Sequence, residues 1–400
     1  MTPIALERPG RAIKLSALPP LALYVHIPWC VRKCPYCDFN SHERAGHLPE
    51  QQYLDALFRD LEGHLPAVWG RRIVSVFIGG GTPSLFSPES IEALLSGARA
   101  RLPIEPHAEI TLEANPGTVE AARFRGFRDA GVNRISIGVQ SFDEGMLAAL
   151  GRIHSAAEAR RAIEAALASF DNVNLDLMYG LPGQSAAMAR ADLAQAIAFR
   201  VPHISAYQLT IEPNTVFYSR PPQLPPHDAT ADMQLAAEEA LAAAGYEHYE
   251  TSAFARPGRR CRHNLNYWEF GDYLGIGAGA HGKLSFPDRI TRHERIKQPR
   301  EYMEMEPSFS ETAVAPEELP FEFMLNALRL IDGVDIRLFG ERTGLPITSI
   351  ERQLATAEGR GLLQRDWKRM RPTERGQRFL NELLETFLTA DRRSPAPASG

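Results

Sequence analysis

The chain has 400 residues, of which 44% are hydrophobic and 23% are charged, a composition typical of a globular protein with a sizeable core. Its formal net charge is −5, with 44 basic against 49 acidic residues, so no overall positive field attracts nucleic acid or an anionic membrane. No run approaches the roughly 18 apolar residues of a membrane span, and the N-terminus lacks a signal-peptide core. We therefore expect a soluble cytoplasmic protein without a membrane span or a nucleic-acid partner.

After an irregular leader over residues 1–20, a unit of one short apolar strand and one amphipathic helix repeats along the chain. Six strands are expected, at Leu21–Pro28, Ile73–Gly79, Ala108–Pro116, Asn133–Ser141, Val173–Gly180 and His203–Thr210. Helices are expected between them, at Glu50–Leu65, Pro88–Arg101, Ala121–Ala130, Ala156–Ser169 and Ala187–Arg200. The α/β pattern predicts a partial (β/α)6 barrel over residues 21–215, with functional groups at the carboxyl ends of its strands. A flat, doubly wound sheet would place the same residues at the same edge.

The second half of the chain has a different character. The proline-rich segment Pro213–Pro226 leads into an extension over residues 216–315. There we expect a helix at Ala229–Ala244 and added antiparallel strands or loops within Tyr246–Phe254 and Tyr267–Leu284. Residues 316–390 predict a C-terminal winged-helix-like α domain, with helices at Pro320–Leu330, Asp335–Thr343, Ser349–Glu358 and Glu374–Leu388 and a possible wing at Leu362–Met370. Residues 391–400 are expected to be disordered.

Three of the four cysteines, Cys30, Cys34 and Cys37, form a C-x3-C-x2-C run directly after the first expected strand. Four cysteines are too few for a disulfide framework, so the run predicts a metal site in a reducing compartment. Three thiolates on one loop can hold three irons of a [4Fe–4S] cluster and leave the fourth iron open to a substrate. A zinc site, with His26 or His42 as a further ligand, is the alternative.

Several other segments accompany this run. Gly79–Pro83 (GGGTP) ends the second expected strand, where glycines let the backbone approach a ligand. With the cysteine run, this segment resembles the radical SAM superfamily, which uses S-adenosylmethionine (SAM). Within the superfamily the chain is similar to the oxygen-independent coproporphyrinogen III oxidase-like group. The further matching segments are Tyr24–Pro28, Gly138–Phe142, Gly151–His154, Asn174–Gly183 and His263–Trp268.

The resemblance implies a [4Fe–4S] cluster held by the three cysteines, and SAM beside it. It implies a SAM pocket formed by Tyr24, Tyr36, Gly80, Gly81, Thr82, Glu113, Gln140, Arg152 and Asp176, with Thr210 and His281 as further candidates. Glu113, Gln140 and Asp176 also fall in or at the ends of expected strands, where side chains converge on the barrel mouth. Buried polar groups need polar partners, which ribose hydroxyls and a sulfonium would provide; a polar network or a helix cap would satisfy them as well.

One position separates two groups within this family. The decarboxylating oxidases carry a fourth cysteine two residues after the third, where this chain has Phe39. The C-x3-C-x2-C-x-F pattern, together with HNxxYW at His263–Trp268, is similar to the radical SAM heme chaperones. That resemblance implies delivery of heme to a heme-accepting protein, such as a respiratory hemoprotein, with a possible transient contact to a membrane protein. Coproporphyrinogen III oxidation and radical SAM modification of RNA are the alternatives, so whether the chain is an enzyme stays open.

His263 is the candidate heme ligand in the HNxxYW segment. A neutral imidazole can bind heme iron, and the rings of Tyr267 and Trp268 offer flat faces for a macrocycle. The same residues have an ordinary structural interpretation, in which His263 makes turn hydrogen bonds and the two aromatic rings fill the core.

Overall fold

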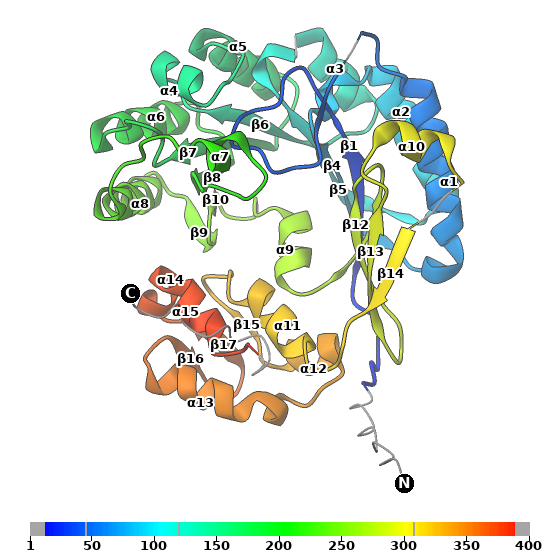
Figure 1. The fold of residues 1–400 in the computed structure, drawn as a ribbon, viewed down its shortest axis with the longest axis vertical. Coiled ribbons are helices and arrows are strands. Elements are labelled where there is room, and N and C mark those ends of the chain that lie inside the picture. Colours follow the sequence, from blue (N-terminus) through cyan, green and yellow to red (C-terminus); the bar gives the residue numbers. More distant parts are fainter. Residues whose placement is uncertain (1–12, 45, 119–120, 307–308, 389–400) are drawn as a thin grey trace.

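The computed structural model describes residues 13–44, 46–118, 121–306 and 309–388. Its framework is a twelve-stranded sheet in the order β14-β13-β12-β11-β1-β4-β5-β6-β7-β8-β10-β9 (Figure 1). The six strands expected from the sequence are β1 (Leu21–Ile27), β4 (Ile73–Gly80), β5 (Ile104–Ala114), β6 (Arg134–Gln140), β7 (Val173–Tyr179) and β8 (His203–Gln208). Each pairs in parallel with the next. The partial parallel barrel is confirmed.

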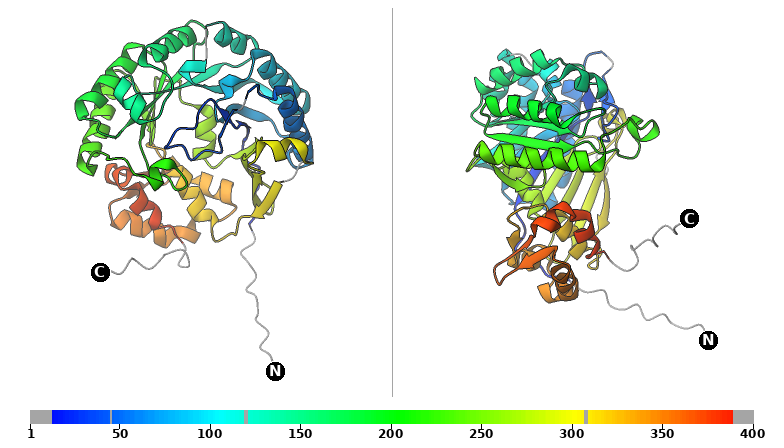
Figure 2. Two further views of the ribbon diagram at one scale, coloured as in Figure 1. Left: turned by 45° about the horizontal axis from the view of Figure 1, so that its top comes forward. Right: turned by 90° about the vertical axis from the view of Figure 1, so that its left-hand side faces the viewer.

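Helices cover the outer face of the curved sheet (Figure 2). They are α1 (Glu50–Val68), α2 (Pro88–Arg101), α3 (Ala121–Asp129), α5 (Ala156–Leu167), α6 (Ala186–Ala198) and α8 (His227–Ala243). A short helix that we did not expect, α4 (Glu144–Ala149), begins after Asp143, whose carboxylate accepts a hydrogen bond from the Met146 amide. An aspartate in this position is a strong helix N-cap, so the sequence did carry the signal.

Burial on both faces explains why the parallel strands are so apolar. In β1 all residues but Tyr24 are buried, and the strand lies in the middle of the sheet, between β4 and β11 (Asp272–Ile276). The helices present one apolar face to this core, and several have N-caps. In α5, Ser155 and Glu158 form a complete capping box. The consistent local signals account for the accuracy of the predicted boundaries.

The extension departs from expectation in two places. Antiparallel strands do flank the parallel ones: β9 (Glu247–Glu250) and β10 (Ala253–Ala255) at one edge, β12 (His281–Ser285), β13 (Ile290–Arg295) and β14 (Phe309–Ala313) at the other. However, β11 pairs with β1 in parallel and only with β12 in the antiparallel direction. The expectation of an antiparallel strand was therefore wrong for the pairing of β11 with β1. Tyr267 and Trp268 lie not in a strand or loop but at the end of a helix, α9 (Arg262–Trp268).

The C-terminal domain has its own core beneath the barrel. It contains α11 (Leu319–Ala327), α12 (Arg337–Thr343), α13 (Glu351–Gly359) and a small sheet of β15 (Val334–Asp335), β17 (Arg369–Pro372) and β16 (Leu363–Arg365). The single last helix that we expected is wrong: the chain forms α14 (Glu374–Arg378) and α15 (Leu380–Glu385), separated by the non-helical backbone of Phe379. Ile13 and Leu15, from the irregular leader, are buried in this second core. The expected tail, 391–400, falls outside the described residues, and the proposed domain boundaries stay predictions.

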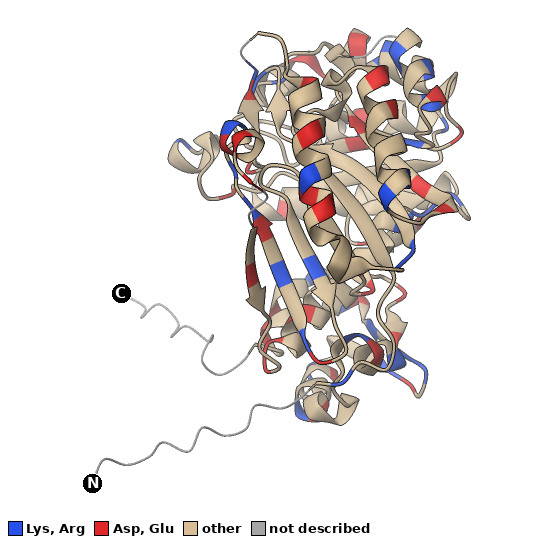
Figure 3. Ribbon diagram, turned by 90° about the vertical axis from the view of Figure 1, so that its right-hand side faces the viewer, with Lys and Arg blue, Asp and Glu red and all other residues tan. Residues whose placement is uncertain are grey.

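The helix α9 lies between the barrel and the C-terminal domain (Figure 1). Leu265 and Trp268 pack against the C-terminal core, while His263 faces β4 of the barrel. The edge strand β9 is also tied to the domain, because Thr251 donates a backbone hydrogen bond to Arg329. Acidic and basic residues both occur over the outer helices (Figure 3). Within the described ranges, no helix is long and apolar enough to cross a membrane.

Candidate metal centre and cofactor pocket

A cavity of about 380 Å³ opens at the carboxyl ends of the parallel strands, under the cysteine loop. This volume lies within the roughly 300–1,000 Å³ typical of small-molecule sites. Most of the residues singled out from the sequence line it together: Cys30, Cys34, Tyr36, Cys37, Gly80, Gly81, Thr82, Glu113, Gln140, Arg152, Asp176 and Thr210. The structure therefore brings residues from seven separate segments to one cavity.

The cysteine loop is fastened at both ends. It starts in β2 (Trp29–Cys30), which pairs with β3 (His42–Glu43) after the loop has returned. Within the loop, the Cys37 amide donates to the Cys34 carbonyl at 3.1 Å. The Asn40 side chain donates to the carbonyls of Ala278 and Lys297, at 2.9 and 2.8 Å, and so anchors the loop to the segments that follow β11 and β13. These contacts hold the thiols over the cavity.

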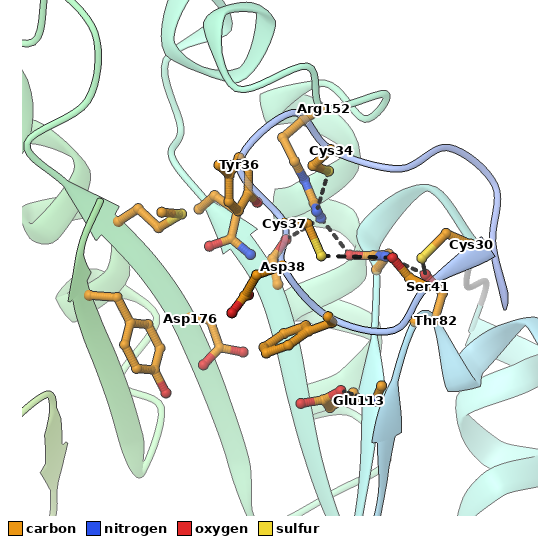
Figure 4. Close-up of a pocket in the computed structure, with 18 of the residues that line it drawn as sticks. Cys30, Cys34, Tyr36, Cys37, Asp38, Ser41, Thr82, Glu113, Arg152 and Asp176 are labelled. Carbon is orange, nitrogen blue, oxygen red and sulfur yellow. Dashed lines mark hydrogen bonds between the residues drawn. The ribbon is translucent and has the colours of Figure 1, made fainter. Parts of the chain in front are cut away.

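Each of the three thiols has a polar side-chain partner (Figure 4). Thr82 donates to Cys30 Sγ at 3.5 Å, and Arg152 donates to Cys34 Sγ at 3.5 Å. Cys37 Sγ lies 3.8 Å from Ser41 Oγ. Burial raises the pKa of Cys30 and of Cys37, so both are protonated at neutral pH until a metal displaces the proton.

The donor set fits an iron–sulfur cluster. Thiolates are soft ligands that suit iron–sulfur clusters and zinc. Among the described residues, no three His, Cys, Asp or Glu side chains converge as the ligands of one metal ion do. The ligands of a [4Fe–4S] cluster stand further apart, because each thiolate binds a different iron. Both ring nitrogens of His26, a candidate zinc ligand, are already engaged, with Tyr24 Oη and the Asn40 carbonyl at 2.9 Å each.

Two carboxyl groups form the wall opposite the cysteines (Figure 4). Glu113 accepts a hydrogen bond from the Gly80 amide at 3.1 Å; burial, then the nearby charge of Asp176, raise its pKa to about 8. Asp176 accepts from Ser136 at 2.9 Å and from Asn174 at 2.8 Å, and burial raises its pKa as well. Acids that burial makes hard to ionise favour a ligand that brings positive charge.

Backbone geometry explains why glycines and one strained residue occur here. A Cβ atom on Gly80 would lie 2.6 Å from the His26 ring, and one on Gly81 would lie 2.6 Å from the Trp29 carbonyl oxygen. Gln140 adopts φ 66°, which is rare for a residue with a side chain. Such strain persists where the surrounding structure demands it, and it clusters at ligand sites.

Three candidates from the sequence do not line the cavity: Tyr24, His281 and His263. Tyr24 lies behind the wall, with its ring stacked on Phe77 at 6.3 Å. His263 is 1% exposed, stacks on the same Phe77 at 4.9 Å and shares a hydrogen bond of 3.0 Å with Ser75. Burial, then the charge of Arg134, lower its pKa to about 3, so the ring is neutral, and its Nε2 has no hydrogen-bond partner among the described residues.

The aromatic residues of the HNxxYW segment separate to two sides of α9. Tyr267 packs edge-on against His263 at 4.9 Å. Trp268 faces the C-terminal domain, where the Arg329 guanidinium lies 4.4 Å from its ring. The structure therefore gives these residues a packing role.

The sequence reasoning missed several lining residues, among them Arg32, Ser41, Asn115, Ser136 and Tyr207. Asn115 and Tyr207 occur at the carboxyl ends of β5 and β8, where the barrel topology alone should have pointed to them. Ser41 offers no such signal, because its place depends on how the loop returns. Phe39, the residue that departs from the oxidase pattern, also lines the cavity and is 59% exposed.

Known proteins resemble the chain along nearly its whole length. Family models match at residues 24–195, for the radical SAM superfamily, and at residues 314–379, for the HemN C-terminal domain. Proteins named heme chaperone HemW from Escherichia coli (strain K12) and Haemophilus influenzae are 53% and 51% identical to the chain. The first match covers 93% of this chain and 99% of its relative, and the second covers 94% and 100%.

A solved structure supports the same fold. Coproporphyrinogen III oxidase (HemN) from Escherichia coli superposes with a TM-score of 0.77 over 92% of this chain and 90% of that chain. At 23% identity this likeness concerns the fold alone. Membership of the radical SAM superfamily implies a [4Fe–4S] cluster and SAM. On the strength of its full-length relatives, the chain belongs to the heme chaperone HemW family of the radical SAM superfamily.

Proposed function

We propose that this protein is a cytoplasmic heme chaperone. It binds a [4Fe–4S] cluster and SAM, and it delivers heme to a heme-accepting protein. The observation that carries the proposal is 53% identity to a heme chaperone over nearly the full length of both chains. The three clustered free thiols support it, since such thiols persist in a reducing compartment. A transient contact with a membrane-bound heme protein belongs to the same proposal.

In this proposal Cys30, Cys34 and Cys37 hold the cluster, which when bound supplies an open iron for the amino and carboxylate groups of SAM. Gly80 and Gly81 line the cavity, and the absence of a side chain lets their backbone pack directly against His26 and Trp29 beside the cysteine loop. The remaining lining residues that the family resemblance suggests for SAM are Tyr36, Thr82, Glu113, Gln140, Arg152 and Asp176. Tyr24 does not line the cavity, so in this proposal it supports the cavity wall from behind and does not contact SAM.

The acidic wall supports SAM as the ligand. Its sulfonium is a fixed positive charge, and Glu113 and Asp176 are the acidic groups whose pKa values burial raises. A cation beside them would let both ionise without leaving an unpaired buried charge. Their oxygens also suit ribose hydroxyls as donors.

For heme we retain His263 as the proposed ligand. Its ring is neutral, and its unpaired Nε2 is the kind of atom that binds iron. Because the ring is 1% exposed against β4, heme binding there requires α9 to move away from the barrel.

Heme transfer is the direct test. Protein reconstituted anaerobically with its cluster and loaded with heme is mixed with a heme-free respiratory cytochrome, and the Soret band of the cytochrome is followed. Apomyoglobin, an unselective heme trap, measures spontaneous release in a parallel sample. We expect faster transfer to the cytochrome than to apomyoglobin, and equal rates would overturn the proposal.

The oxidase alternative is tested with the same material. Reductant, SAM and coproporphyrinogen III are supplied, and protoporphyrinogen IX formed per protein is measured. We expect none, and sustained turnover would replace the chaperone assignment as the main function.

A further inference from the structure

Asn115 connects two of the three cysteines through a continuous set of hydrogen bonds. It lies outside the sequence segments that carry the family resemblance. Asn115 follows β5 and lines the cavity. Its Nδ2 donates to Thr82 Oγ1 at 2.8 Å, and its Oδ1 accepts from Arg152 Nη2. Thr82 and Arg152 are the donors to Cys30 and Cys34. Asn115 therefore stands between the two donors.

The direction of these hydrogen bonds is fixed by chemistry. Arginine has donors only, so the atom of Asn115 that faces Arg152 has to be the carbonyl oxygen. The amide nitrogen then faces Thr82 and uses the hydroxyl oxygen as its acceptor. The amide nitrogen cannot accept a hydrogen bond, so the single proton of the Thr82 hydroxyl is left to be donated to Cys30 Sγ.

We call Thr82, Asn115 and Arg152 the hydrogen-bonded frame. Further hydrogen bonds from neighbouring residues hold this frame in place. The Asn115 carbonyl accepts hydrogen bonds from the amide and the hydroxyl of Thr118, at 3.0 and 2.8 Å. Arg152 Nη2 also donates to the Gly138 carbonyl at 2.9 Å. Thr82 is 2% exposed, so water does not compete for its hydroxyl. The third cysteine is independent of this frame, because its partner is Ser41.

We propose that Asn115 is a positioning residue that sets the reduction potential of the cluster, by directing the Thr82 proton to Cys30 and holding the Arg152 guanidinium on Cys34. Hydrogen bonds to the sulfurs stabilise the more negative, reduced cluster and so raise its potential. This inference rests on the proposed cluster but not on heme transfer.

The test is a redox titration of the reconstituted protein without SAM, heme or acceptor, followed by the electron paramagnetic resonance signal of the reduced cluster. For Asn115→Ala we expect at least a tenfold fall in the ratio of reduced to oxidised cluster at a fixed potential, which corresponds to a shift of about 59 mV for one electron. Asn115→Leu, which keeps more of the volume, is the second variant in case the alanine variant folds poorly.

The matched control is Asn133→Ala. Asn133 also bridges two groups through both ends of its amide, from the Ile110 amide at 2.8 Å to the Ala108 carbonyl at 2.9 Å, but it does not line the cavity. We expect its potential to equal that of the unaltered protein.

A double variant separates positioning from simple packing. Thr82→Val removes the donor to Cys30 directly, so Asn115→Ala should shift the potential less in that background than alone. Additive shifts, an unchanged potential in an Asn115 variant with a full cluster, an equal shift in Asn133→Ala, or loss of the cluster from both Asn115 variants would overturn the proposal. Because heme plays no part in the measurement, failure of heme transfer would leave the result intact.

Discussion

The two ends of the barrel each carry residues able to bind a metal, yet the fold treats them in opposite ways. At the carboxyl ends of the strands, Cys30, Cys34 and Cys37 line a cavity, and each has a polar partner. Near the other end, Cys261 is fully buried and its thiol lies 3.4 Å from Glu109 Oε1. His263 is closed in beside it. Residue type indicates what a side chain can bind, and access decides whether it can do so without a movement of the fold.

We call the end with the cavity the open end of the barrel, and the end with Cys261 and His263 the closed end. The helix α9 is what closes it. This helix carries His263 towards the barrel and Trp268 towards the C-terminal core, so the helix is packed on both sides. The open end is formed by the cysteine loop and the carboxyl ends of the strands, which line a cavity. The comparison teaches that cysteine and histidine residues, which are typical of metal sites, occur both in a ligand cavity and in a tightly packed region.

The largest effect should come from the open end. Replacing any one of Cys30, Cys34 and Cys37 by Ala should lower the iron content of the reconstituted protein from about four per chain to near zero, because one iron loses its protein ligand. Cys261→Ala should retain the full content. Iron and sulfide assays on the purified variants measure both. Equal iron loss in Cys261→Ala would break the distinction between the two ends.

A smaller effect on folding is expected at the closed end. His263→Ala removes a buried ring and leaves Ser75 without its partner, at a cost of about 2–4 kcal/mol in the free energy of unfolding. Urea titration measures it, with His107→Ala, at an exposed site, as the control. Iron content should not change. Heme binding should fall in this variant as well, because His263 is the proposed heme ligand, and unchanged heme binding would overturn that assignment.

The pH dependence sharpens the description of the open end. Glu113 has a pKa of about 8, so below that pH it must lose a proton before it can face a cation. SAM affinity should therefore rise by about tenfold per pH unit between about pH 6 and 8, and Glu113→Gln should remove most of that slope. Equilibrium binding to reconstituted protein tests this.

The same group affects stability without ligand. A carboxyl whose pKa is raised on folding stabilises the fold most below its unfolded value of 4.5, and this contribution is lost as the pH rises through about 8. The stability of Glu113→Gln should accordingly depend less on pH over that range. An unchanged pH dependence would show that Glu113 is already ionised in the empty protein.

The smallest effect is expected at Phe39. The ring is 59% exposed, so Phe39→Cys should change the free energy of unfolding by less than about 0.5 kcal/mol. Restoring the cysteine of the oxidase pattern should not produce protoporphyrinogen, because one thiol does not build a substrate site. Product formation by this variant would show that a single residue separates the two groups.

Much of the open end could be predicted from the sequence, since its residues lie in or directly after strands whose order follows from the βα repeat. Local signals were strong there, as in the capped helix α5. The closed end was harder. The parallel pairing of β11 with β1 depends on a contact between distant segments, which no local pattern reveals. We expected strands or loops there because of the glycines after Phe270. We therefore missed α9, although its buried residues His263 and Asn266 are three apart, as on one face of a helix.

The position of Asn115 shows the limit most clearly. We did not predict it as a lining residue, although it directly follows a strand, and its role depends on which atoms of Thr82 and Arg152 face it. That is a property of the packed loops rather than of any spacing in the chain.

The pairing of β1 with β11 also has a consequence for how the protein is made. β1 carries the cysteine loop, yet one of its two neighbours in the sheet is synthesised about 250 residues later. At about 5–20 residues per second, the ribosome needs roughly 10–50 seconds to supply it. During that interval the thiols are attached to a sheet that lacks a flanking strand. We therefore expect insertion of the proposed cluster to follow synthesis of β11, because only then can Asn40 fasten the cysteine loop to Ala278 and Lys297.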